Sequence, residues 1–399
     1  MPQYYYTAKS KEREGDVTDI AKAESKKKLA DKLREEGLFL IEAEEVKKEG
    51  GFFFGGISLQ DKIFFLRNLR MMLSGGLSLS RSLRTIAKQI KNEKLRSILL
   101  AVREDIQKGE TLSQAMGKYP DEFSKMFINV LRLSEETGKL EENLGILINQ
   151  FEKEDQLKSE VKGALVYPAV IAVAMIVVGI VMLIFVVPML SDTFESMGAE
   201  LPITTRFFIG LGEFLAAYWF LIPLILISIF FSLKFTLKTS KGKYIFDTMV
   251  LKVPIVSRVV KKINSARAAR TLNSMLSSGI SIIKSLDIIA ESMANVHFKE
   301  ALNSSAESIK KGSKLSEALN PHSHLFSFLM IQMIEVGEET GNTSEVLEKT
   351  ADFLEEEVFS AMKNLTSVIE PALMIVVGVA VGFFAFSMLT PIYSIMDML

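Results

Sequence analysis

Residues 108–115 read KGETLSQA, and residues 311–318 read KGSKLSEA, so one octapeptide returns 203 positions later. The same offset relates three further features: the EETG turns at 135–138 and 338–341, the MLSGG and MLSSG segments at 72–76 and 275–279, and the proline pairs Pro168 with Pro371 and Pro188 with Pro391. Amphipathic helices that resemble each other by chance do not keep one ungapped register over this length. The pattern therefore indicates an internal duplication.

Three runs without a charged residue accompany the two copies. They cover residues 163–191, 214–233 and 371–396, and they are 29, 20 and 26 residues long. A helix needs about 20 apolar residues to cross the ~30 Å hydrocarbon layer of a membrane. We therefore predict three transmembrane helices, over residues 163–191, 214–233 and 368–396.

The distribution of Lys and Arg predicts how the chain is oriented. Residues 192–213 hold one basic residue, Arg206, against four acidic ones, whereas residues 234–270 hold ten basic residues and the single acid Asp247. Loops rich in Lys and Arg stay on the cytoplasmic side. We expect the N-terminus and residues 234–366 in the cytoplasm, and the 192–213 loop and the C-terminus in the periplasm. The protein is then a multi-pass protein of the bacterial inner membrane.

Each copy of the repeat carries helical periodicity before its charge-free run. Apolar residues recur at i, i+3, i+4 and i+7, as in residues 123–131. Thr111 and Gln114 have the spacing of a capping box, which predicts the start of a helix. The expected fold class is a mainly α membrane protein with two tandem cytoplasmic bundles of about six short helices each, at 58–160 and within 234–366.

The first 46 residues differ from the repeat. Tyr4 to Ala8 is short and aromatic, Thr18 to Glu36 has a helical pattern, and Leu38 to Ala43 is apolar, which together predict a small β-α-β unit. Residues 47–57 contain GGFFFGG, which is typical of a flexible linker. The alternative is that its three phenylalanines dock on a partner or on the membrane surface.

Residue types that carry most enzyme chemistry are scarce. The chain has no Cys and three His, and it contains no phosphate-binding loop and no serine nucleophile motif. His322 and His324 share one segment, where we expect an exposed turn, since a catalytic zinc needs three protein ligands. A net charge of −1 argues against a surface built for nucleic acid. We therefore predict no enzymatic activity, no metal and no cofactor.

The charge-free runs also bear on transport. An ion-coupled transporter or a stator subunit needs an ionisable residue near the middle of the bilayer, and every charge here lies outside the runs. A membrane transporter or stator subunit is thus the alternative function, which measurable ion flux would favour. A further alternative is a membrane receptor whose bundles bind a soluble signalling protein.

Several motifs together resemble the F-type inner-membrane platform proteins of type II secretion systems and type IV pilus assembly machines, over nearly the whole chain. They are LSGGL at 73–77, MLSSGI at 275–280, the two EETG turns, Tyr167-Pro168 and VVP at 186–188. The resemblance implies a non-enzymatic platform that couples a cytoplasmic hexameric ATPase to the insertion or extraction of pilin or pseudopilin subunits. It also implies contacts with other inner-membrane assembly proteins and with lipids, and a homo-oligomer, a dimer or larger.

The glycine turns of the repeat have two interpretations. Gly138 and Gly341 are expected to end one helix with a positive φ, so that the next helix can fold back. The alternative is that the turns contact a partner or bind a cation through their glutamates. The candidate residues are Glu136, Thr137, Gly138, Glu339, Thr340, Gly341, Gly76 and Gly279.

The basic segment at 234–270 also has two interpretations. Its positive charge is expected to keep this part of the chain inside and to contact anionic lipids. The alternative is docking against an acidic face of the ATPase, with Lys261, Lys262 and Arg267 as the contact residues.

Prolines mark the membrane entry in both copies of the repeat. Pro168 lies near the start of the first charge-free run and Pro371 opens the third, and Pro188 and Pro391 follow twenty residues later. We expect a helix start or a kink at these positions. The alternative is a hinge that passes motion from a bundle to its span.

Overall fold

The computed structural model describes residues 3–10, 16–35, 37–46, 56–186, 206, 210, 212, 214, 217–218 and 221–396. The chain divides into two compact units, residues 1–56 and residues 57–399, each with its own hydrophobic core. Most of the expected Gly/Phe linker lies outside the described residues. Ile57, at the end of that linker, is buried in the core of the second unit.

The N-terminal unit is a three-stranded antiparallel sheet with one helix. Strands β1 (Gln3–Ser10), β2 (Asp16–Lys22) and β3 (Leu38–Val46) form the sheet in the order β2-β1-β3, and α1 (Lys26–Glu35) connects β2 to β3. Leu29 and Leu33 lie four residues apart on one face of α1. They are buried in a cluster that also contains Tyr6, Ala8, Ala23 and Ala43.

One expectation for this unit is wrong. The helix expected over Thr18–Glu36 begins only at Lys26, because Asp16–Lys22 is strand β2. This segment pairs along its whole length with β1. Val17, Thr18 and Ile20 are β-branched and favour a strand once a partner strand is present. The unit is therefore β-β-α-β and not β-α-β.

The second unit contains two sets of helices with matching boundaries. The first set is α2 (Leu59–Ser74), α3 (Leu79–Gln89), α4 (Glu93–Gln107), α5 (Leu112–Gly117), α6 (Lys125–Thr137) and α7 (Leu140–Val181). The second set is α12 (Pro254–Ser277), α13 (Ile282–Ser292), α14 (Val296–Lys310), α15 (Leu315–Leu319), α16 (Phe328–Thr340) and α17 (Thr343–Met396). From α3 and α13 onward, each helix of the second set starts 203 residues after its counterpart. The duplication is thus present in the helix boundaries themselves. We call residues 57–160 the first module and residues 254–366 the second module.

Several shorter elements complete the second unit. The π-helical turn η1 (Met182–Val186) ends the first repeat, α10 (Leu221–Lys238) and α11 (Ser240–Lys252) lead into the second, and the 3-10 turn η2 (Asn320–His322) follows α15. The expected periplasmic loop lies almost entirely outside the described residues, as do Pro188 and part of the expected span at 214–233.

Helix starts follow their sequence signals. The predicted capping box is confirmed: the Thr111 side chain accepts from the backbone N–H of Gln114, and the Gln114 side chain accepts from the backbone N–H of Thr111. Ser58 and Asp61 form the same arrangement at the start of α2. These caps satisfy backbone N–H groups that a helix leaves without an internal partner.

One continuous hydrophobic core runs through both modules. In the first module the Phe127 ring lies 4.9 Å from the Phe123 ring and 6.0 Å from the Phe151 ring, centroid to centroid. In the second module the Phe298 and Phe326 rings meet edge to face at 5.2 Å. Full burial of one such side chain contributes about 1.5–3 kcal/mol. Both modules are therefore well-packed bodies that hold their turns in place.

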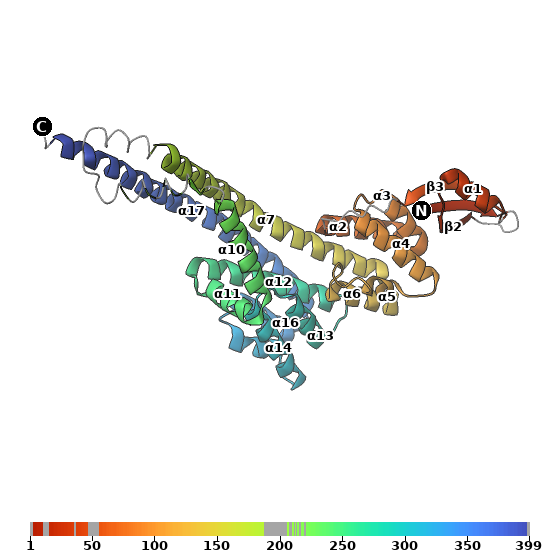
Figure 1. The fold of residues 1–399 in the computed structure, drawn as a ribbon. Coiled ribbons are helices and arrows are strands. Elements are labelled where there is room, and N and C mark those ends of the chain that lie inside the picture. The colour runs from red at the N-terminus through yellow and green to blue at the C-terminus, as the bar shows by residue number, and fades with distance from the viewer. Residues whose placement is uncertain are drawn as a thin grey trace. The chain divides into compact units, whose positions relative to one another are not determined.

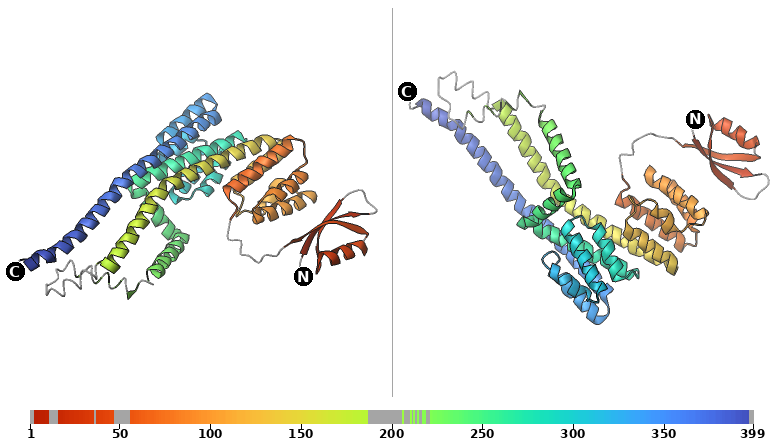
Figure 2. Two further views of the ribbon diagram at one scale, coloured as in Figure 1. Left: turned by 90° about the horizontal axis from the view of Figure 1, so that it is seen from above. Right: turned by 60° about the horizontal axis from the view of Figure 1, so that its bottom comes forward.

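Helices α7 and α17 continue from the modules into apolar segments without a break. Among the described residues, two helices are long and apolar enough to cross a membrane, over Leu140–Val181 and Thr343–Val379. Their apolar side chains, such as Val170, Val173 and Val379, are exposed, as a lipid environment requires. α7 and α17 run side by side away from the modules (Figures 1 and 2).

Of the two expectations for the membrane-entry prolines, a helix start or a kink, the helix start is wrong and the kink stays a prediction. Pro168 lies inside α7 and Pro371 inside α17, and Pro391 also falls within α17. A proline inside a helix frees the carbonyl of the residue four positions earlier. For Pro168 that carbonyl belongs to Ala164, and the Thr366 hydroxyl of α17 donates to it at 3.2 Å. The neighbouring helix therefore supplies the hydrogen bond that the proline removes.

Candidate functional site

The two EETG turns have the same backbone geometry. Gly138 and Gly341 both have φ 71° and ψ 10°, and each caps the helix before it. The expected positive φ is confirmed at both glycines. The neighbouring Thr137 and Thr340 hydroxyls donate to carbonyls of their own helices, at 2.7 Å and 2.8 Å. The turns are rigid helix ends, and their threonines are already engaged.

The first glutamate of each turn has a structural role that the sequence analysis missed. The Glu135 carboxylate accepts from the backbone N–H groups of Leu112 and Ser113, the latter at 3.1 Å. Glu338 accepts from Leu315 and Ser316 at 2.6 Å and 3.1 Å. Each carboxylate thus caps the N-terminus of a short helix, α5 or α15, where anions are stabilised.

The second glutamate of each turn is free of such contacts. Glu136 and Glu339 are exposed. Neither side chain makes a hydrogen bond or ion pair with another residue in the described part of the chain. They are the carboxylates of these turns that remain available to a partner.

The other glycine turns are also equivalent. Gly76 has φ 77° and Gly279 has φ 86°. After each glycine the chain turns back, and the N–H of Leu77 donates to the carbonyl of Met72 at 3.0 Å, as that of Ile280 does to Met275 at 2.9 Å. This bonding pattern closes a helix C-terminus. Gly76 and Gly279 therefore have a structural reason to be glycine.

The junction between the two modules is held by charged groups. The Arg270 guanidinium of α12 donates to Glu355 of α17 at 2.8 Å and also to Asp352. Lys153 of α7 reaches Asp352 at 2.8 Å and Glu355 at 3.5 Å. The Arg270 and Glu355 side chains are only 4% and 7% exposed. Two cations and two anions from three helices thus balance one another, with Arg270 and Glu355 buried and Lys153 and Asp352 partly exposed.

The pKa values of Asp352, Lys153 and Arg270 shift as ion pairing requires. Burial raises the pKa of Asp352, but hydrogen bonds from Lys153 and Arg270 outweigh it, and the net pKa is lowered. The hydrogen bond with Asp352 raises the pKa of Lys153. Burial acts to lower the pKa of Arg270, and its bonds with Glu355 and Asp352 raise it overall. Asp352, Lys153 and Arg270 therefore stay charged at neutral pH.

Polar contacts extend the junction beside the charged cluster. The Ser274 hydroxyl of α12 donates to the Gln150 side-chain oxygen at 2.8 Å, and the Gln150 amide lies 3.3 Å from the Thr271 hydroxyl. All three residues are buried. The first module therefore contacts the second through one face of α7, and α6 adds an ion pair between Lys125 and Glu291 of α13 at 2.8 Å.

The candidate residues of the basic segment have separate environments. Lys262 pairs with Glu357 at 3.0 Å, and Arg267 is half-buried with its Nε free of a hydrogen-bond partner among the described residues. Lys261 lines a pocket. In the same segment α11 exposes Tyr244, Ile245, Phe246 and Met249. Exposed apolar side chains next to lysines are typical of a helix at a membrane surface.

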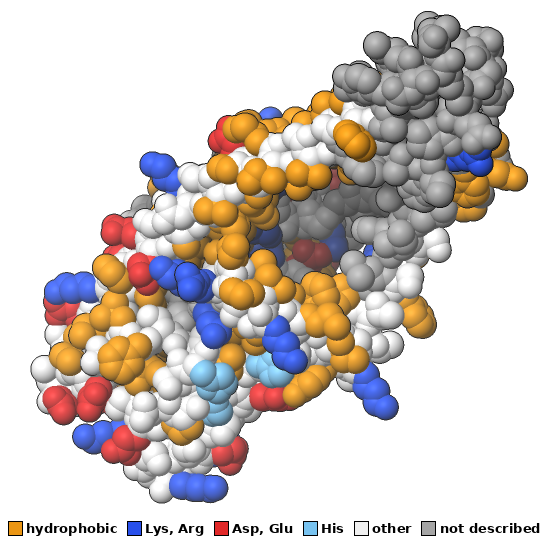
Figure 3. All heavy atoms as spheres, turned by 90° about the vertical axis from the view of Figure 1, so that its left-hand side faces the viewer, with side chains coloured by type: hydrophobic (Ala, Val, Ile, Leu, Met, Phe, Trp, Pro, Cys, Tyr) orange, Lys and Arg blue, Asp and Glu red, His pale blue; other side chains and the backbone are white. Residues whose placement is uncertain are grey.

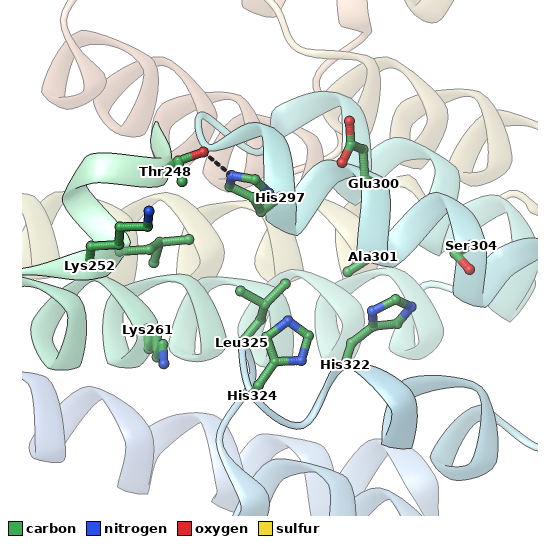
Figure 4. Close-up of a pocket in the computed structure, with 11 residues that line it drawn as sticks. Thr248, Lys252, Lys261, His297, Glu300, Ala301, Ser304, His322, His324 and Leu325 are labelled. Atoms are coloured by element: carbon green, nitrogen blue, oxygen red, sulfur yellow. Dashed lines mark hydrogen bonds between the residues drawn. The ribbon is translucent and has the colours of Figure 1, made fainter. Parts of the chain in front are cut away.

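All three histidines of the chain line one pocket of about 470 Å³ (Figure 4). His297 comes from α14, and its Nε2 lies 2.8 Å from the Thr248 hydroxyl of α11. His322 and His324 approach from the segment after α15, with ring centroids 6.4 Å apart. Figure 3 shows the histidines gathered on one face with lysine or arginine side chains close by. The remaining lining residues are Leu251, Lys252, Lys261, Glu300, Ala301, Ser304 and Leu325.

The pocket was not found from the sequence. His322 is half-buried, whereas Ser323 and His324 of the expected turn are exposed. Burial lowers the pKa of His322, and the neighbouring His324 lowers it further. Within the described parts of the chain, no group of three His, Asp or Glu side chains is placed to hold a metal ion.

The first module lacks an equivalent pocket lining. Lys94 and Glu122 occupy the positions of His297 and Leu325, and they form an ion pair. The hydrogen bond from Lys94 lowers the pKa of Glu122. Tyr119 and Asp121 stand where the second module has His322 and His324. The two modules have thus diverged at this place while keeping the same helices.

The sequence matches a known family in both copies of the repeat. The family described as "Type II secretion system (T2SS), protein F" matches residues 65–188 and again residues 268–391. Type IV pilus assembly protein PilC of Thermus thermophilus is 33% identical over 406 residues, which cover 100% of this chain and 99% of that protein. Type IV pilus assembly protein TapC of Aeromonas hydrophila is 32% identical, over 88% of this chain and 86% of its own. Type II secretion system protein F of Aeromonas hydrophila is 29% identical, over 95% and 99%.

Proposed function

The chain belongs to the type II secretion system protein F family, and we propose that it is the inner-membrane platform of a type IV pilus or type II secretion machine. In this role it couples a cytoplasmic assembly ATPase to the insertion or extraction of pilin or pseudopilin subunits. Other inner-membrane assembly proteins and lipids are its further partners, and it acts as a homo-oligomer.

One observation carries this proposal: each module continues into an apolar helix that leads away from it. α7 extends from Leu140 to Val181 and α17 from Thr343 to Met396, each as one helix. A continuous helix transmits displacement along its axis, because its turns are hydrogen-bonded to one another except at the prolines. A movement imposed on a module therefore reaches the membrane segment directly. This is what coupling between an ATPase and a membrane-embedded subunit requires.

The proposed topology has three spans, with the modules inside and the C-terminus outside. α10 supplies the helix for the middle span. Because the chain has no cysteine, single cysteines at Leu100, Glu195 and Lys310 can be tested with a membrane-impermeant maleimide on intact cells. We expect labelling only at Glu195. Labelling at Leu100 but not at Lys310, or the reverse, contradicts the topology.

The exposed glutamates of the EETG turns are the proposed contacts for the ATPase. α7 starts at Leu140, and its charge-free run starts at Gly163. At 1.5 Å per residue the turn lies roughly 35 Å below the start of the apolar run. In the second module α17 starts at Thr343 and the charge-free run starts at Pro371, so this turn lies roughly 42 Å below its apolar run. Both turns therefore face the compartment in which an ATPase would work.

A charge reversal tests these contacts. Glu136→Lys together with Glu339→Lys should abolish co-purification of the ATPase, because a contact built on carboxylates then becomes repulsive. Glu104→Lys is the matched control, since Glu104 is also an exposed carboxylate of the first module. Equal ATPase recovery from the double variant and the control would rule the turns out.

The basic segment is proposed to contact anionic lipid, with docking of the ATPase as the second possibility. Lys261→Glu with Arg267→Glu separates the two, because ATPase capture at rising salt responds only if these residues dock the enzyme. Lys262 needs its own control, since reversal of its charge also breaks the ion pair with Glu357. Glu357→Gln removes that ion pair while it keeps the lysine.

The decisive experiment is affinity purification of the full chain from native membranes. We expect a hexameric ATPase and at least one pilin or pseudopilin among the captured proteins. Loss of surface pili after deletion assigns the chain to a pilus machine, and loss of secreted enzymes with pili intact assigns it to a secretion machine. Ion flux through the purified protein in liposomes, without any of these partners, would support the transporter alternative.

A further inference from the structure

The junction between the modules uses a different face of each. The first module presents Gln150 and Lys153 on α7, and we call these two residues the presenting face. The second module receives them with Arg270 and Ser274 of α12 and Asp352 and Glu355 of α17, which we call the receiving face.

Because the chain is duplicated, each face has a counterpart 203 residues away. The counterpart of the presenting face is Phe353 and Glu356 on α17. The counterpart of the receiving face lies on α2 and α7 of the first module, and it consists of Arg67, Met71, Asn149 and Glu152. Arg67 pairs with Glu152 at 2.7 Å, as Arg270 pairs with Glu355.

Both counterpart faces are uncovered within one chain. Phe353 is 48% exposed and Met71 is 71% exposed, whereas their counterparts Gln150 and Ser274 are buried. The Arg67 side chain is 60% exposed, and that of Arg270 only 4%. Within the described part of one chain, the presenting face of the second module and the receiving face of the first module are therefore not covered by another module.

The residues of the two free faces have changed together. Gln150 and Ser274 form a polar pair inside the chain, and their counterparts Phe353 and Met71 are both apolar. A thioether next to an aromatic ring is a favourable contact. This coordinated change keeps the two free faces complementary to each other.

The charges have changed together as well. Lys153 meets Asp352 inside the chain, and the counterparts of these residues are Glu356 and Asn149. The positive Lys153 of the presenting face thus corresponds to the negative Glu356, and the acidic Asp352 of the receiving face corresponds to the neutral Asn149. Arg67 then remains as the cation that Glu356 meets. Exposed apolar and charged residues on two matching faces mark an interaction surface.

The geometry of the junction decides how further copies are arranged. Lys153 contacts Glu355, the counterpart of its neighbour Glu152, and Ala164 contacts Thr366, the counterpart of its neighbour Gly163. These paired positions differ by one residue of the repeat, and the Lys153–Asp352 pair differs by four, because Asp352 is the counterpart of Asn149. The offset along the helices is thus about 1.5–6 Å, and the modules are related mainly by a rotation about the helix direction. Repetition of such an operation closes a ring where the rotation divides a full turn.

We propose that a second copy of this chain covers these faces, with Phe353 and Glu356 of one protomer packed on Met71 and Arg67 of the next. The contact between copies repeats the contact between modules inside one chain. In a membrane all copies share one orientation, and a rotation axis along the spans satisfies that requirement. The proposal specifies the surfaces of the homo-oligomer named under the proposed function, and it does not depend on the identity of the ATPase or the pilin.

Disulfide crosslinking tests the proposal cleanly, because the natural chain has no cysteine. Met71→Cys and Phe353→Cys are placed in two differently tagged copies, which are co-expressed and mildly oxidised in membranes without ATPase or pilin. We expect a disulfide-linked dimer that carries both tags. Each variant expressed alone should stay monomeric on a non-reducing gel, because the two positions lie on different faces.

The crosslinking experiment has a positive control within one chain and a negative control at an exposed position outside the junction. Gln150→Cys with Ser274→Cys in one chain should be bridged internally by a short bifunctional thiol reagent, because the Ser274 Oγ and Gln150 Oε1 atoms lie 2.8 Å apart and the reagent spans the length lost with the glutamine side chain. The same reagent is added to the Met71→Cys and Phe353→Cys copies, and Glu104→Cys replaces Met71→Cys as an exposed position outside the junction. If the internal bridge forms but Met71→Cys links to Phe353→Cys no better than Glu104→Cys does, the proposal is wrong. A dimer linked through two copies of Phe353→Cys also overturns it.

A charge swap gives an independent readout. Arg67→Glu should reduce the oligomer in detergent, measured by light scattering, and Arg67→Glu combined with Glu356→Arg should restore it. Loss of the oligomer without restoration in the double variant would contradict the pairing of these two residues. Because neither experiment includes an ATPase, the assembly surface and the platform function are tested separately.

Discussion

The Thr366 hydroxyl of α17 lies 3.2 Å from the Ala164 carbonyl of α7, which is the carbonyl that Pro168 leaves without its helical partner. The same hydroxyl lies 3.1 Å from the Met362 carbonyl of its own helix, so one hydrogen serves two acceptors. The two long helices are therefore joined at the proline, near the start of the charge-free run.

This contact predicts a difference between two small substitutions. Thr366→Val keeps the shape but leaves the Ala164 carbonyl without a donor, which costs about 1–3 kcal/mol when the group is shielded from water. Thr366→Ser keeps the hydroxyl and should change the stability far less. Thermal unfolding of the purified full chain in one detergent measures both variants. A Val variant as stable as the natural chain would show that this hydrogen bond does not contribute.

The repeated arginines predict a second contrast. Arg270→Met leaves Glu355 buried without its main partner, which costs about 3–5 kcal/mol. Arg67→Met removes the matching pair with Glu152 at an exposed position, where such a pair contributes about 0–1 kcal/mol to the monomer. Denaturant unfolding of monomeric protein compares the two. If both variants lose a similar amount of unfolding free energy, Arg270 is not buried at the junction.

The capping glutamates predict a third contrast, within one dipeptide. Glu135→Ala should cost about 0.5–2 kcal/mol, because the N-terminus of α5 loses its acceptor. Glu136→Ala, one residue further on and exposed, should stay within about 0.5 kcal/mol. Hydrogen exchange at the Leu112 and Ser113 amides shows whether the loss is local, since these N–H groups donate to Glu135. Protection that is unchanged in Glu135→Ala would contradict the cap.

The turn glycines predict a fourth result. Gly138 has φ 71°, and a Cβ added there would meet nothing within 4 Å, so the cost of a side chain is conformational and not steric. Gly138→Ala should lose about 1 kcal/mol, and Gly138→Asn should lose less, since asparagine tolerates the left-handed region. The same order is expected at Gly341. Melting temperatures give the comparison, and an Ala variant as stable as the natural chain would exclude the strained conformation.

The sequence predicted the features that depend on local pattern. The duplication, the turn glycines and the Thr111 cap could be read from spacing, because a helix end needs particular residues close by in the chain. The strand at Asp16–Lys22 was missed, because its pairing with β1 outweighs local preference. The role of Glu135 was missed for a similar reason, as its acceptor function depends on amides 22 and 23 residues away.

The histidine pocket and the module junction could not be predicted from the sequence, because both depend on contacts between residues that are far apart in the chain. His297 and His322 lie on different elements, and only the packing of α14 against the segment after α15 brings them together. The junction likewise joins Lys153 to Asp352, which are 199 residues apart. Contacts over such separations leave no periodic signal. The repeat does, however, show which positions to compare once one contact is known.

The pocket predicts a fifth result, a pH dependence of stability. Burial and the neighbouring His324 lower the pKa of His322 below its usual 6.5 in the folded chain. The unfolded chain then binds more protons in this range, so the stability contribution of neutral His322 is fully present above about pH 6.5 and is lost as pH falls through the lowered pKa. His322→Gln should therefore flatten the decline of melting temperature between about pH 7 and pH 5, by a small amount because the ring is half-exposed. His324→Gln should raise the pKa of His322, measured from its ring proton resonances. A pKa of His322 that stays unchanged in His324→Gln would show that the two rings do not repel each other.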